Sequence, residues 1–449
     1  MEDTIAAIST ALGVGAISII RVSGNDSIKI VNEIFKGKDL TKQNTHTIHY
    51  GYIVDNEKII DEVLVSIMKN PKTFTKEDIV EINCHGGIAT TNKVLELVLN
   101  KGARLAEPGE FTKRAFLNGR IDLIEADGIM NLISSKTDKA RQLSINQLSG
   151  KVSNNIAYLR EELIKIISNI EVNIDYPEYE DIEVLSNEKI LPSIQLLKQK
   201  LTTIIKESED GKLINEGINV GIIGRPNVGK SSLLNSLLEE NKAIVTDIEG
   251  TTRDIVEGTI TLNGVVLNII DTAGIRKTDN IVEQIGVEKS YEIIDKSDLI
   301  IFVLNNNEEL TQEDLELYQK IQNKEHIIVL NKIDLEQKIN LDNIKEDIIK
   351  ISLKNNNADL ILNKITEIYN LDKLEIKDQT YLSNARNISL LKKSLNNINN
   401  SITHIENNSP IDIVELELKE SWNTLGEIIG KTYTDELLDQ LFSRFCLGK

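Results

Sequence analysis

The sequence is poor in the residues that mark secreted and membrane-spanning proteins. Its 449 residues include two cysteines, Cys84 and Cys446, which are too few and too far apart for a disulfide framework. No apolar run approaches the roughly 20 residues that a transmembrane helix needs. The N-terminal residues carry acids where a signal peptide carries lysine or arginine. We therefore expect a cytoplasmic protein that is not inserted in a membrane.

Histidine and positive charge are also scarce. The five histidines show no spacing typical of zinc ligands, and Cys84 and His85 would point to opposite faces of a strand. The formal net charge is -19, whereas a protein that holds nucleic acid by its overall field is usually basic. We expect no zinc site, and any contact with RNA would use a local basic patch or a partner's surface.

The pattern of apolar residues divides the chain into four segments. We predict an α+β N-terminal domain, a helical domain made of two sequence segments, and a P-loop α/β domain of the Ras type inserted between them. The boundaries are 1–118 for the N-terminal domain, 119–213 for the first helical segment, 214–372 for the α/β domain and 373–449 for the second helical segment.

The inserted domain has the alternating strands and helices of a doubly wound parallel sheet. Asn263-Gly264 is a two-residue hairpin signal, so one pair of strands should be antiparallel. The helix before this domain is predicted to end at Gly211. The Asn-rich stretches 355–363 and 396–402 are interpreted as coding bias or loops rather than repeats, and the second lies in a segment, 382–405, that is predicted to be helical. The predicted strands are 218–224, 258–262, 265–271, 298–304, 326–331 and 347–352.

A phosphate-binding loop is predicted at 224–231, where Gly-Arg-Pro-Asn-Val-Gly-Lys-Ser follows a strand and begins a helix. In such a loop, backbone N–H groups and the helix N-terminus cradle phosphates, Lys230 reaches the β- and γ-phosphates, and Ser231 ligates Mg²⁺. A Gly-rich turn without nucleotide is the alternative for this motif alone.

Three further motifs follow in the order of guanine-nucleotide-binding proteins. Asp271 begins Asp-Thr-Ala-Gly at a strand end, where its carboxylate can hold Mg²⁺ through water. Asp334 ends Asn-Lys-Ile-Asp and can accept two hydrogen bonds from guanine, which adenine cannot donate. Ser352-Leu-Lys354 resembles the loop that backs the base. Together the four motifs predict an enzyme that hydrolyses GTP.

The glutamine that many GTPases place after Asp-x-x-Gly to orient water is replaced by Ile275, which cannot do so. No arginine finger is identifiable, because Arg253 and Arg276 are interpreted as structural partners of neighbouring acids. Thr252 can ligate Mg²⁺ in the closed state. The group that completes hydrolysis must come from elsewhere.

These motifs resemble those of the MnmE/TrmE family of tRNA-modifying GTPases. The resemblance extends to Ile-Ile-Arg-Val-Ser-Gly at 19–24, to 107–120 and to the terminal Cys-Leu-Gly-Lys at 446–449. These segments separate the chain from ribosome-assembly GTPases of the Era or Der type, which are the alternative class. A membrane-surface regulatory GTPase is disfavoured because no amphipathic basic anchor is present.

The resemblance implies that K⁺ replaces the arginine finger, bound by the Asn227 side chain and oxygens of Thr246, Ile248 and Thr251. Glu283 would orient the attacking water through a second water. A cation beside the phosphates would offset the charge of a loose transition state. The predicted GTP contacts are Asn227, Val228, Gly229, Lys230, Ser231, Ser232, Thr246, Asp247, Ile248, Glu249, Gly250, Thr251, Thr252, Asp271, Thr272, Ala273, Gly274, Asn331, Lys332, Asp334, Ser352 and Lys354, with Ser231 and Thr252 on Mg²⁺.

The resemblance also implies that the N-terminal domain is aminomethyltransferase-like and binds 5-formyl- or methylene-tetrahydrofolate. Arg21, Glu81 and Arg120 match folate-holding positions, and the Glu81 carboxylate can accept two hydrogen bonds from the pterin. Lys449 would line the site and Cys446 would be catalytic. From the residues alone, an arginine at a strand end is ordinarily an ion-pair partner, and the tail could be a frayed end.

The implied function is K⁺-dependent GTP hydrolysis that drives addition of a carboxymethylaminomethyl or aminomethyl group to C5 of the wobble uridine, U34, in certain tRNAs. The family acts as a homodimer and forms a heterotetramer with the FAD-dependent protein MnmG. We therefore expect tRNA and this second protein as partners, and dimerisation through the N-terminal domain.

Overall fold

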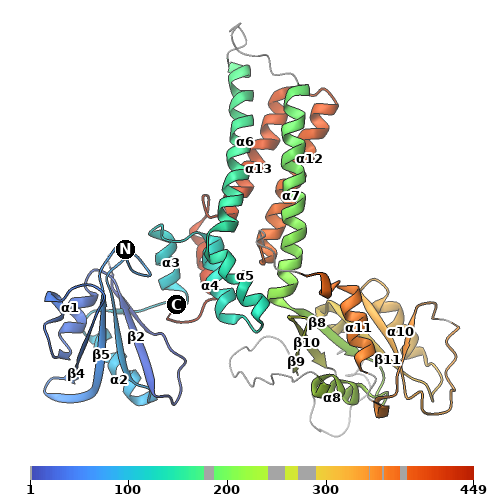
Figure 1. The fold of residues 1–449 in the computed structure, drawn as a ribbon, viewed down its shortest axis with the longest axis horizontal. Helices are drawn as coiled ribbons and strands as arrows, with labels where there is room; N and C mark the ends of the chain where they lie inside the picture. The colour runs from blue at the N-terminus through green and yellow to red at the C-terminus, as the bar shows by residue number, and fades with distance from the viewer. Residues whose placement is uncertain are drawn as a thin grey trace. The chain divides into compact units, whose positions relative to one another are not determined.

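The computed structural model describes residues 3–175, 187–240, 258–271, 290–342, 344–355, 358–374 and 382–448. It forms two compact units. Their helices and strands are labelled in Figure 1. The first unit contains Met1–Met130, Ile156–Leu185 and His404–Lys449, and the second contains Asn131–Asn155 and Ser186–Thr403. Among the described residues, no helix is both long and apolar enough to span a membrane.

The first unit is built on a seven-stranded sheet of order β3-β4-β5-β6-β2-β1-β7. Alternating side chains such as Val63, Val65 and Ile67 face helices α1 and α2 and form the buried core, since successive side chains of a strand point to opposite faces. The elements are β1 (Ile5–Ile8), β2 (Ile17–Ser23), α1 (Ser27–Asn32), β3 (Phe35–Lys36), β4 (Thr47–Asp55), β5 (Lys58–Met68), β6 (Ile79–His85), α2 (Ile88–Asn100) and β7 (Arg104–Leu105).

Helices follow this sheet in the sequence. Within the first predicted helical segment, 119–213, a new helix begins after Thr137. The Thr137 side chain accepts a hydrogen bond from the Ala140 N–H and so caps the start of this helix. In the first unit, Phe116, Phe442 and Phe445 form a small buried cluster with their neighbours. The helices are α3 (Glu110–Leu117), α4 (Leu123–Ser134), α5 (Asp138–Leu148), α6 (Lys151–Asp175), α7 (Asn187–Glu216), α12 (Ala385–Glu406), α13 (Ile411–Ile428) and α14 (Asp435–Phe442).

The second unit contains a six-stranded sheet of order β13-β12-β11-β8-β10-β9. All neighbours are parallel except β9 and β10, which are antiparallel across Asn263-Gly264, so the hairpin prediction is confirmed. The elements are β8 (Ile218–Ile223), α8 (Lys230–Glu240), β9 (Gly258–Leu262), β10 (Val265–Asp271), β11 (Leu299–Asn305), α10 (Gln312–Ile321), β12 (His326–Asn331), β13 (Ile348–Lys350) and α11 (Asp359–Ile368), with short 3-10 turns at Leu40–Lys42, Leu353–Asn355 and Leu371–Lys373.

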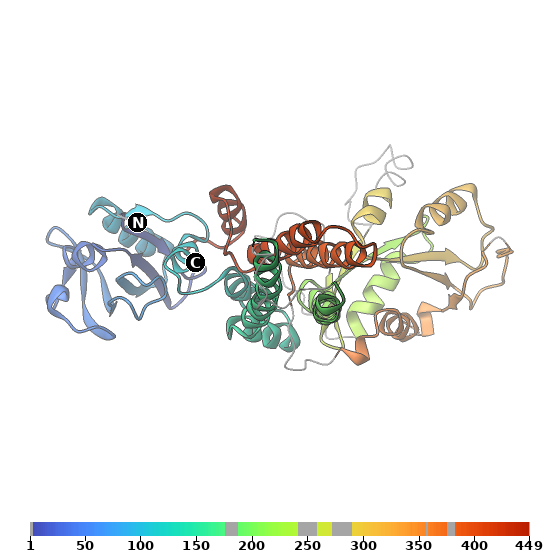
Figure 2. The same ribbon diagram turned by 90° about the horizontal axis from the view of Figure 1, so that it is seen from above.

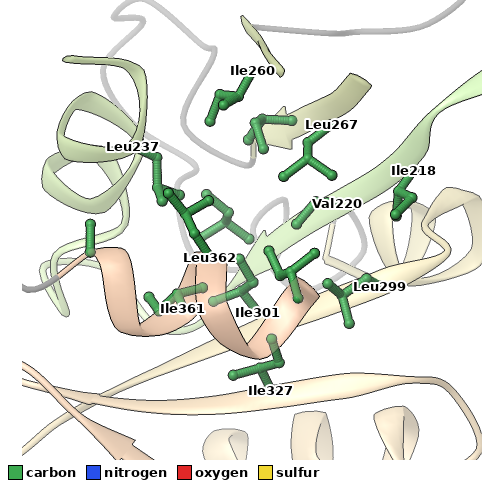
Figure 3. Close-up of a cluster of buried hydrophobic side chains, with 14 of the residues drawn as sticks. Ile218, Val220, Leu237, Ile260, Leu267, Leu299, Ile301, Ile327, Ile361 and Leu362 are labelled. Atoms are coloured by element: carbon green, nitrogen blue, oxygen red, sulfur yellow. The ribbon is translucent and has the colours of Figure 1, made fainter. Parts of the chain in front are cut away.

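Both faces of this sheet are covered (Figure 2). One core contains Leu237 of α8 and Ile361 of α11 packed on strand residues such as Val220 and Ile301 (Figure 3). The other contains Leu317 of α10 packed on the opposite side of the strands. The structure thus confirms the predicted doubly wound α/β domain.

One prediction about where a helix ends was wrong. Helix α7 continues through Gly211 to Glu216, because buried Ile214 packs into the core of the second unit. The helix ends instead at Gly217, whose φ of +79° only glycine adopts easily. The predicted helix over 382–405 is confirmed by α12, which includes the Asn-rich stretch 396–402 and its buried Ile398.

Candidate functional site

The loop between β8 and α8 has the backbone of a phosphate-binding loop. Gly224 and Gly229 have φ values of +143° and +111°, and Asn227 is left-handed at +60°. A Cβ on Gly224 would lie 2.4 Å from the Val303 carbonyl oxygen, and one on Gly229 would lie 2.2 Å from the Asn331 amide nitrogen. The motif therefore needs glycine at both positions for reasons of space as well as conformation.

Lys230 closes this loop from the first position of α8. Its Nζ donates to the carbonyl oxygens of Gly224 at 2.6 Å and Arg225 at 2.8 Å. The ammonium group therefore lies across the mouth of the loop, and Ser231 and Ser232 follow it as exposed residues in the first turn of the helix. A helix N-terminus with a lysine over its loop is suited to bind phosphate oxygens.

The second predicted motif lies directly against the loop. The buried Asn331 side chain donates from Nδ2 to the Val228 carbonyl at 2.9 Å. Lys332, also left-handed with a φ of +62°, donates from Nζ to the Asn227 carbonyl at 2.8 Å. The last residue of β12 and the residue after it therefore fix two consecutive carbonyls of the loop, which joins the predicted base site to the phosphate site.

Asp334 lies at the rim of the same site. Its Oδ1 accepts from the Ser352 hydroxyl at 2.8 Å, and Lys354 Nζ lies 3.3 Å from Oδ2. The hydrogen bond from Ser352 lowers the pKa of Asp334 below its ordinary value, and the charge of Lys354 acts in the same direction. The carboxylate is therefore ionised at neutral pH and can act only as a hydrogen-bond acceptor.

Several predicted residues lie outside the described parts of the chain. Asp271 is described only through its backbone, as the last residue of β10. The others are Thr246, Asp247, Ile248, Glu249, Gly250, Thr251, Thr252, Thr272, Ala273, Gly274, Glu283 and Lys449.

Arg225 is a site residue that the sequence analysis missed. Its Nε lies 2.8 Å from Oδ2 of Asp314, a carboxylate that is 1% exposed, and its Nη2 lies 3.4 Å from Glu308. Asp314 also completes a capping box with Thr311 at the start of α10. The Thr-x-x-Asp spacing could have predicted the helix start, although nothing local indicates the arginine as partner. Arg225 thereby links the phosphate loop to α10.

A second group of predicted residues lies on the sheet of the first unit. Arg21 of β2 faces Glu81 of β6 across the antiparallel pair, with Nε donating to Oε1 at 2.9 Å. The Arg21 guanidinium carbon lies 5.9 Å from the Phe74 ring centre and 5.8 Å from that of Phe111. The Arg120 guanidinium carbon lies 4.8 Å from the Phe74 ring centre. Two of the three residues predicted from the resemblance, Arg21 and Arg120, thus lie over Phe74, and the third, Glu81, is bound to Arg21. Phe74 was not predicted from the sequence.

The C-terminal segment reaches this group within the same unit. The Gly448 carbonyl accepts from the Ser9 hydroxyl at 3.1 Å and from Arg21 Nη1 at 3.4 Å. Cys446 is exposed. In β6, Cys84 is buried and His85 is exposed, so the prediction that they point to opposite faces is confirmed. Among the described residues, no group of three His, Cys, Asp or Glu side chains could hold a metal ion.

Comparison with known proteins identifies the family to which the chain belongs. A family model for the MnmE helical domain matches residues 123–446, and one for the GTP-binding protein TrmE N-terminus matches residues 4–120. The tRNA modification GTPase MnmE of Bacillus cytotoxicus is 53% identical over 455 aligned positions, covering 100% of this chain and 99% of the relative. The MnmE of Bacillus mycoides is 52% identical with the same coverage.

The G domain of the T. maritima FeoB iron transporter is 25% identical, with a TM-score of 0.26, and the match covers 34% of this chain and 98% of that domain. The family assignment rests on the two family models and the full-length relatives, which match the N-terminal and helical segments as well as the nucleotide-binding domain. The chain therefore belongs to the MnmE family of tRNA modification GTPases.

Proposed function

We propose that this GTPase uses K⁺-dependent hydrolysis of GTP to drive a folate-dependent modification of tRNA. The product is a carboxymethylaminomethyl or aminomethyl group on C5 of wobble uridine U34, made together with the FAD-dependent protein MnmG. The observation that carries this proposal is that Arg21 and Arg120 lie over one phenylalanine and Arg21 is bound to Glu81, in a unit that does not contain the phosphate loop.

The nucleotide part of the proposal assigns two cations. Mg²⁺ is held by Ser231 and Thr252, and the exposed position of Ser231 in the first turn of α8 fits this role. K⁺ is held by Asn227, Thr246, Ile248 and Thr251. The Asn227 carbonyl is already bound by Lys332, while the residue is exposed, so its side-chain amide oxygen suits a monovalent cation.

K⁺ bound there would supply positive charge beside the phosphates during hydrolysis. The chain's own residues hold the reactants: the loop amides and Lys230 bind the phosphates, and the ionised Asp334 selects guanine. Glu283 orients the attacking water. We also assign the other predicted residues between Thr246 and Gly274 to contacts with GTP.

The folate part of the proposal rests on shape and charge. Arg21 and Glu81 are 19% and 22% exposed, so a ligand can reach them although much of their surface is covered. A flat pterin ring suits an aromatic side chain flanked by two guanidinium groups, and the Glu81 carboxylate can accept from the pterin's amine and N3–H. We assign Lys449 to the same site and Cys446 to the chemistry.

The proposal that the protein forms a homodimer is supported by the sheet of the first unit. Its open face carries exposed apolar side chains, including Ile48 at 66%, Tyr50 at 57% and Leu64 at 47%, and Tyr50 pairs with Leu64 across β4 and β5. An exposed apolar patch of this kind suits contact with a second copy, which supports a homodimer formed through this domain.

The proposed domain boundaries are 1–118 for folate binding and dimerisation, 119–213 and 373–449 for the helical domain, and 214–372 for GTP binding. The buried core of the second unit includes Leu371 and also Leu374, which lies two residues past the proposed boundary at 372. We propose that the protein acts in the cytoplasm, where tRNA and the second protein are available.

Mass spectrometry of tRNA nucleosides tests this function directly. A strain lacking the protein should lose the C5 substituent at U34, the wild-type gene should restore it, and a gene encoding Glu81→Ala should not. Normal nucleosides in the deletion strain would exclude the proposed modification, and full rescue by Glu81→Ala would exclude the folate site.

A further inference from the structure

The C-terminal segment, residues 446–448, packs closely against the end of β1 through the backbone of Gly448. Gly448 has a φ of +85°, and a Cβ at this position would lie 2.3 Å from the Ile8 carbonyl oxygen. The next residue, Ser9, donates its hydroxyl to the Gly448 carbonyl at 3.1 Å. Only glycine can come this close to the strand, so the contact depends on the residue at position 448.

A second contact holds the same segment a little earlier in the chain. The Gly109 N–H donates to the Cys446 carbonyl at 3.4 Å. A Cβ on Gly109, whose φ is +70°, would lie 2.5 Å from the Phe442 carbonyl oxygen. The segment that carries the exposed thiol is therefore held on both sides of Cys446.

Arg21 connects the docked segment to the candidate ligand site. Its Nε and Nη2 contact one oxygen of Glu81 at 2.9 and 2.8 Å, and its Nη1 points to the Gly448 carbonyl at 3.4 Å. A guanidinium is planar and presents its N–H groups in a fixed fork, so two acceptors on different sides define its orientation. The Gly448 carbonyl thus helps to orient the guanidinium that in turn orients Glu81.

We propose that Ser9 and Gly448 are positioning residues for the Arg21–Glu81 site, and that docking of the C-terminal segment and binding of the folate ligand strengthen each other. This inference rests on the proposed folate function. Because coupling between two binding events is reciprocal, loss of docking weakens the ligand, and the ligand in turn favours the docked segment. Cys446 is thereby brought to the site when a ligand is present.

Four variants of the full chain test this coupling. Gly448→Ala places a methyl group against the Ile8 carbonyl and should release the segment. Ser9→Ala removes the hydroxyl donor, and Ser9→Thr retains it. Gly102→Ala is the matched control, because Gly102 also has a positive φ, +109°, yet no atom lies within 4 Å of the added Cβ.

Two measurements are needed for each variant. Calorimetric titration with 5-formyltetrahydrofolate gives the affinity. The anisotropy of a dye attached to Cys446, the exposed one of the two cysteines, reports whether the segment is docked. We expect Gly448→Ala to show low anisotropy and about tenfold weaker binding, the effect of losing one hydrogen bond to a charged group. For Ser9→Ala, both the folate affinity and the dye anisotropy should lie between those of Gly448→Ala and the wild type. Ser9→Thr and Gly102→Ala should resemble the wild type in both measurements.

The outcomes separate this inference from the function on which it rests. If the wild-type protein does not bind the folate, the folate part of the proposed function fails. If the wild type binds and Gly448→Ala binds equally well with its segment released, the coupling is excluded. If the segment of Gly448→Ala stays docked, the role of Gly448 as a positioning residue is excluded. Should Gly448→Ala not fold, Ser9→Ala decides in its place, since wild-type affinity in that variant together with a mobile dye excludes the coupling.

Discussion

The Asn331 side chain, 103 residues from Val228 in the sequence, donates a 2.9 Å hydrogen bond to the Val228 carbonyl in the centre of the phosphate loop. Lys332 likewise donates a hydrogen bond to the Asn227 carbonyl. The Asn-Lys-Ile-Asp motif predicted to recognise the base therefore also supports the loop predicted to bind phosphates. A change at Asn331 should therefore affect the binding of the whole nucleotide.

Asn331→Ala should weaken binding of both GTP and GDP. The residue is 3% exposed, and losing one buried hydrogen bond costs about 1–3 kcal/mol, or roughly 5- to 150-fold in affinity. Titration with fluorescent GDP and GTP analogues measures the effect. Asn363→Ala, an exposed asparagine of α11, serves as control and should bind both nucleotides like the wild type. An unchanged affinity in Asn331→Ala would show that the loop holds its shape without this bond.

Replacing K⁺ by Na⁺ at equal ionic strength should slow GTP turnover by at least about tenfold, since a cation in place of an arginine finger supplies much of the charge stabilisation in the transition state. Asn227→Gly is the sharper variant, because glycine adopts the observed φ of +60° without strain and keeps the carbonyl that Lys332 binds. It should lose the K⁺ response and still bind GTP. Equal steady-state rates in the two salts would exclude the potassium site.

Asp334→Asn should shift nucleotide preference from GTP towards XTP. The substitution turns a group that only accepts hydrogen bonds into one that also donates, which suits the extra carbonyl of xanthine better than the amine of guanine. Competition between GTP and XTP in a turnover assay measures the change, and Asp342→Asn, an exposed aspartate elsewhere in the second unit, provides the control. A mutant that still prefers GTP would place another residue against the base.

The His85–Asp61 pair should show a pH dependence of known sign. The hydrogen bond from His85 Nδ1 to Asp61 Oδ1, 2.7 Å long, raises the pKa of His85 above its ordinary value, and the charge of Asp61 adds to this. Because the folded-state pKa is raised, the stabilisation is fully present below the unfolded-state pKa of about 6.5 and is lost as pH rises through the folded-state value. NMR titration of the imidazole measures this directly.

Asp61→Asn keeps the size of the side chain and removes its charge. The pKa of His85 should then return towards about 6.5. If the pKa of His85 stays raised in this variant, another neighbour causes the shift. Glu62 is the other acid whose charge raises this pKa.

The nucleotide-binding fold was predictable because its signals are local. Each motif occupies a few consecutive residues at the end of a strand, and buried strands such as β11 are apolar along their whole length. The Asn263-Gly264 turn likewise depends only on the two residues that form it. For these elements the sequence contains the geometric reason for the structure.

Contacts between distant segments could not be predicted in this way. Arg225 and Asp314 are 89 positions apart in the sequence, and the residues next to each of them do not predict that the two form an ion pair. Phe74 lies outside any helix or strand, so no periodicity marks it as part of a site. The residues around it were found through a family resemblance, and docking of Gly448 against Ile8 follows only from coordinates.

The end of helix α7 has a mechanical consequence. Only Gly217 separates this helix of 30 residues from β8, the strand that leads into the phosphate loop. The Gly217 backbone is fixed against Val266, since a Cβ there would lie 2.4 Å from the Val266 carbonyl oxygen, and the Asn268 side chain donates to the Glu216 carbonyl at 3.2 Å. Helix and strand are therefore joined without a flexible linker.

At 1.5 Å per residue such a helix is roughly 45 Å long, so a rotation of about 5° at its base would displace its far end by about 4 Å. Any rotation of β8, the strand that leads into the phosphate loop, would thus be amplified along helix α7, with Gly217 as the pivot.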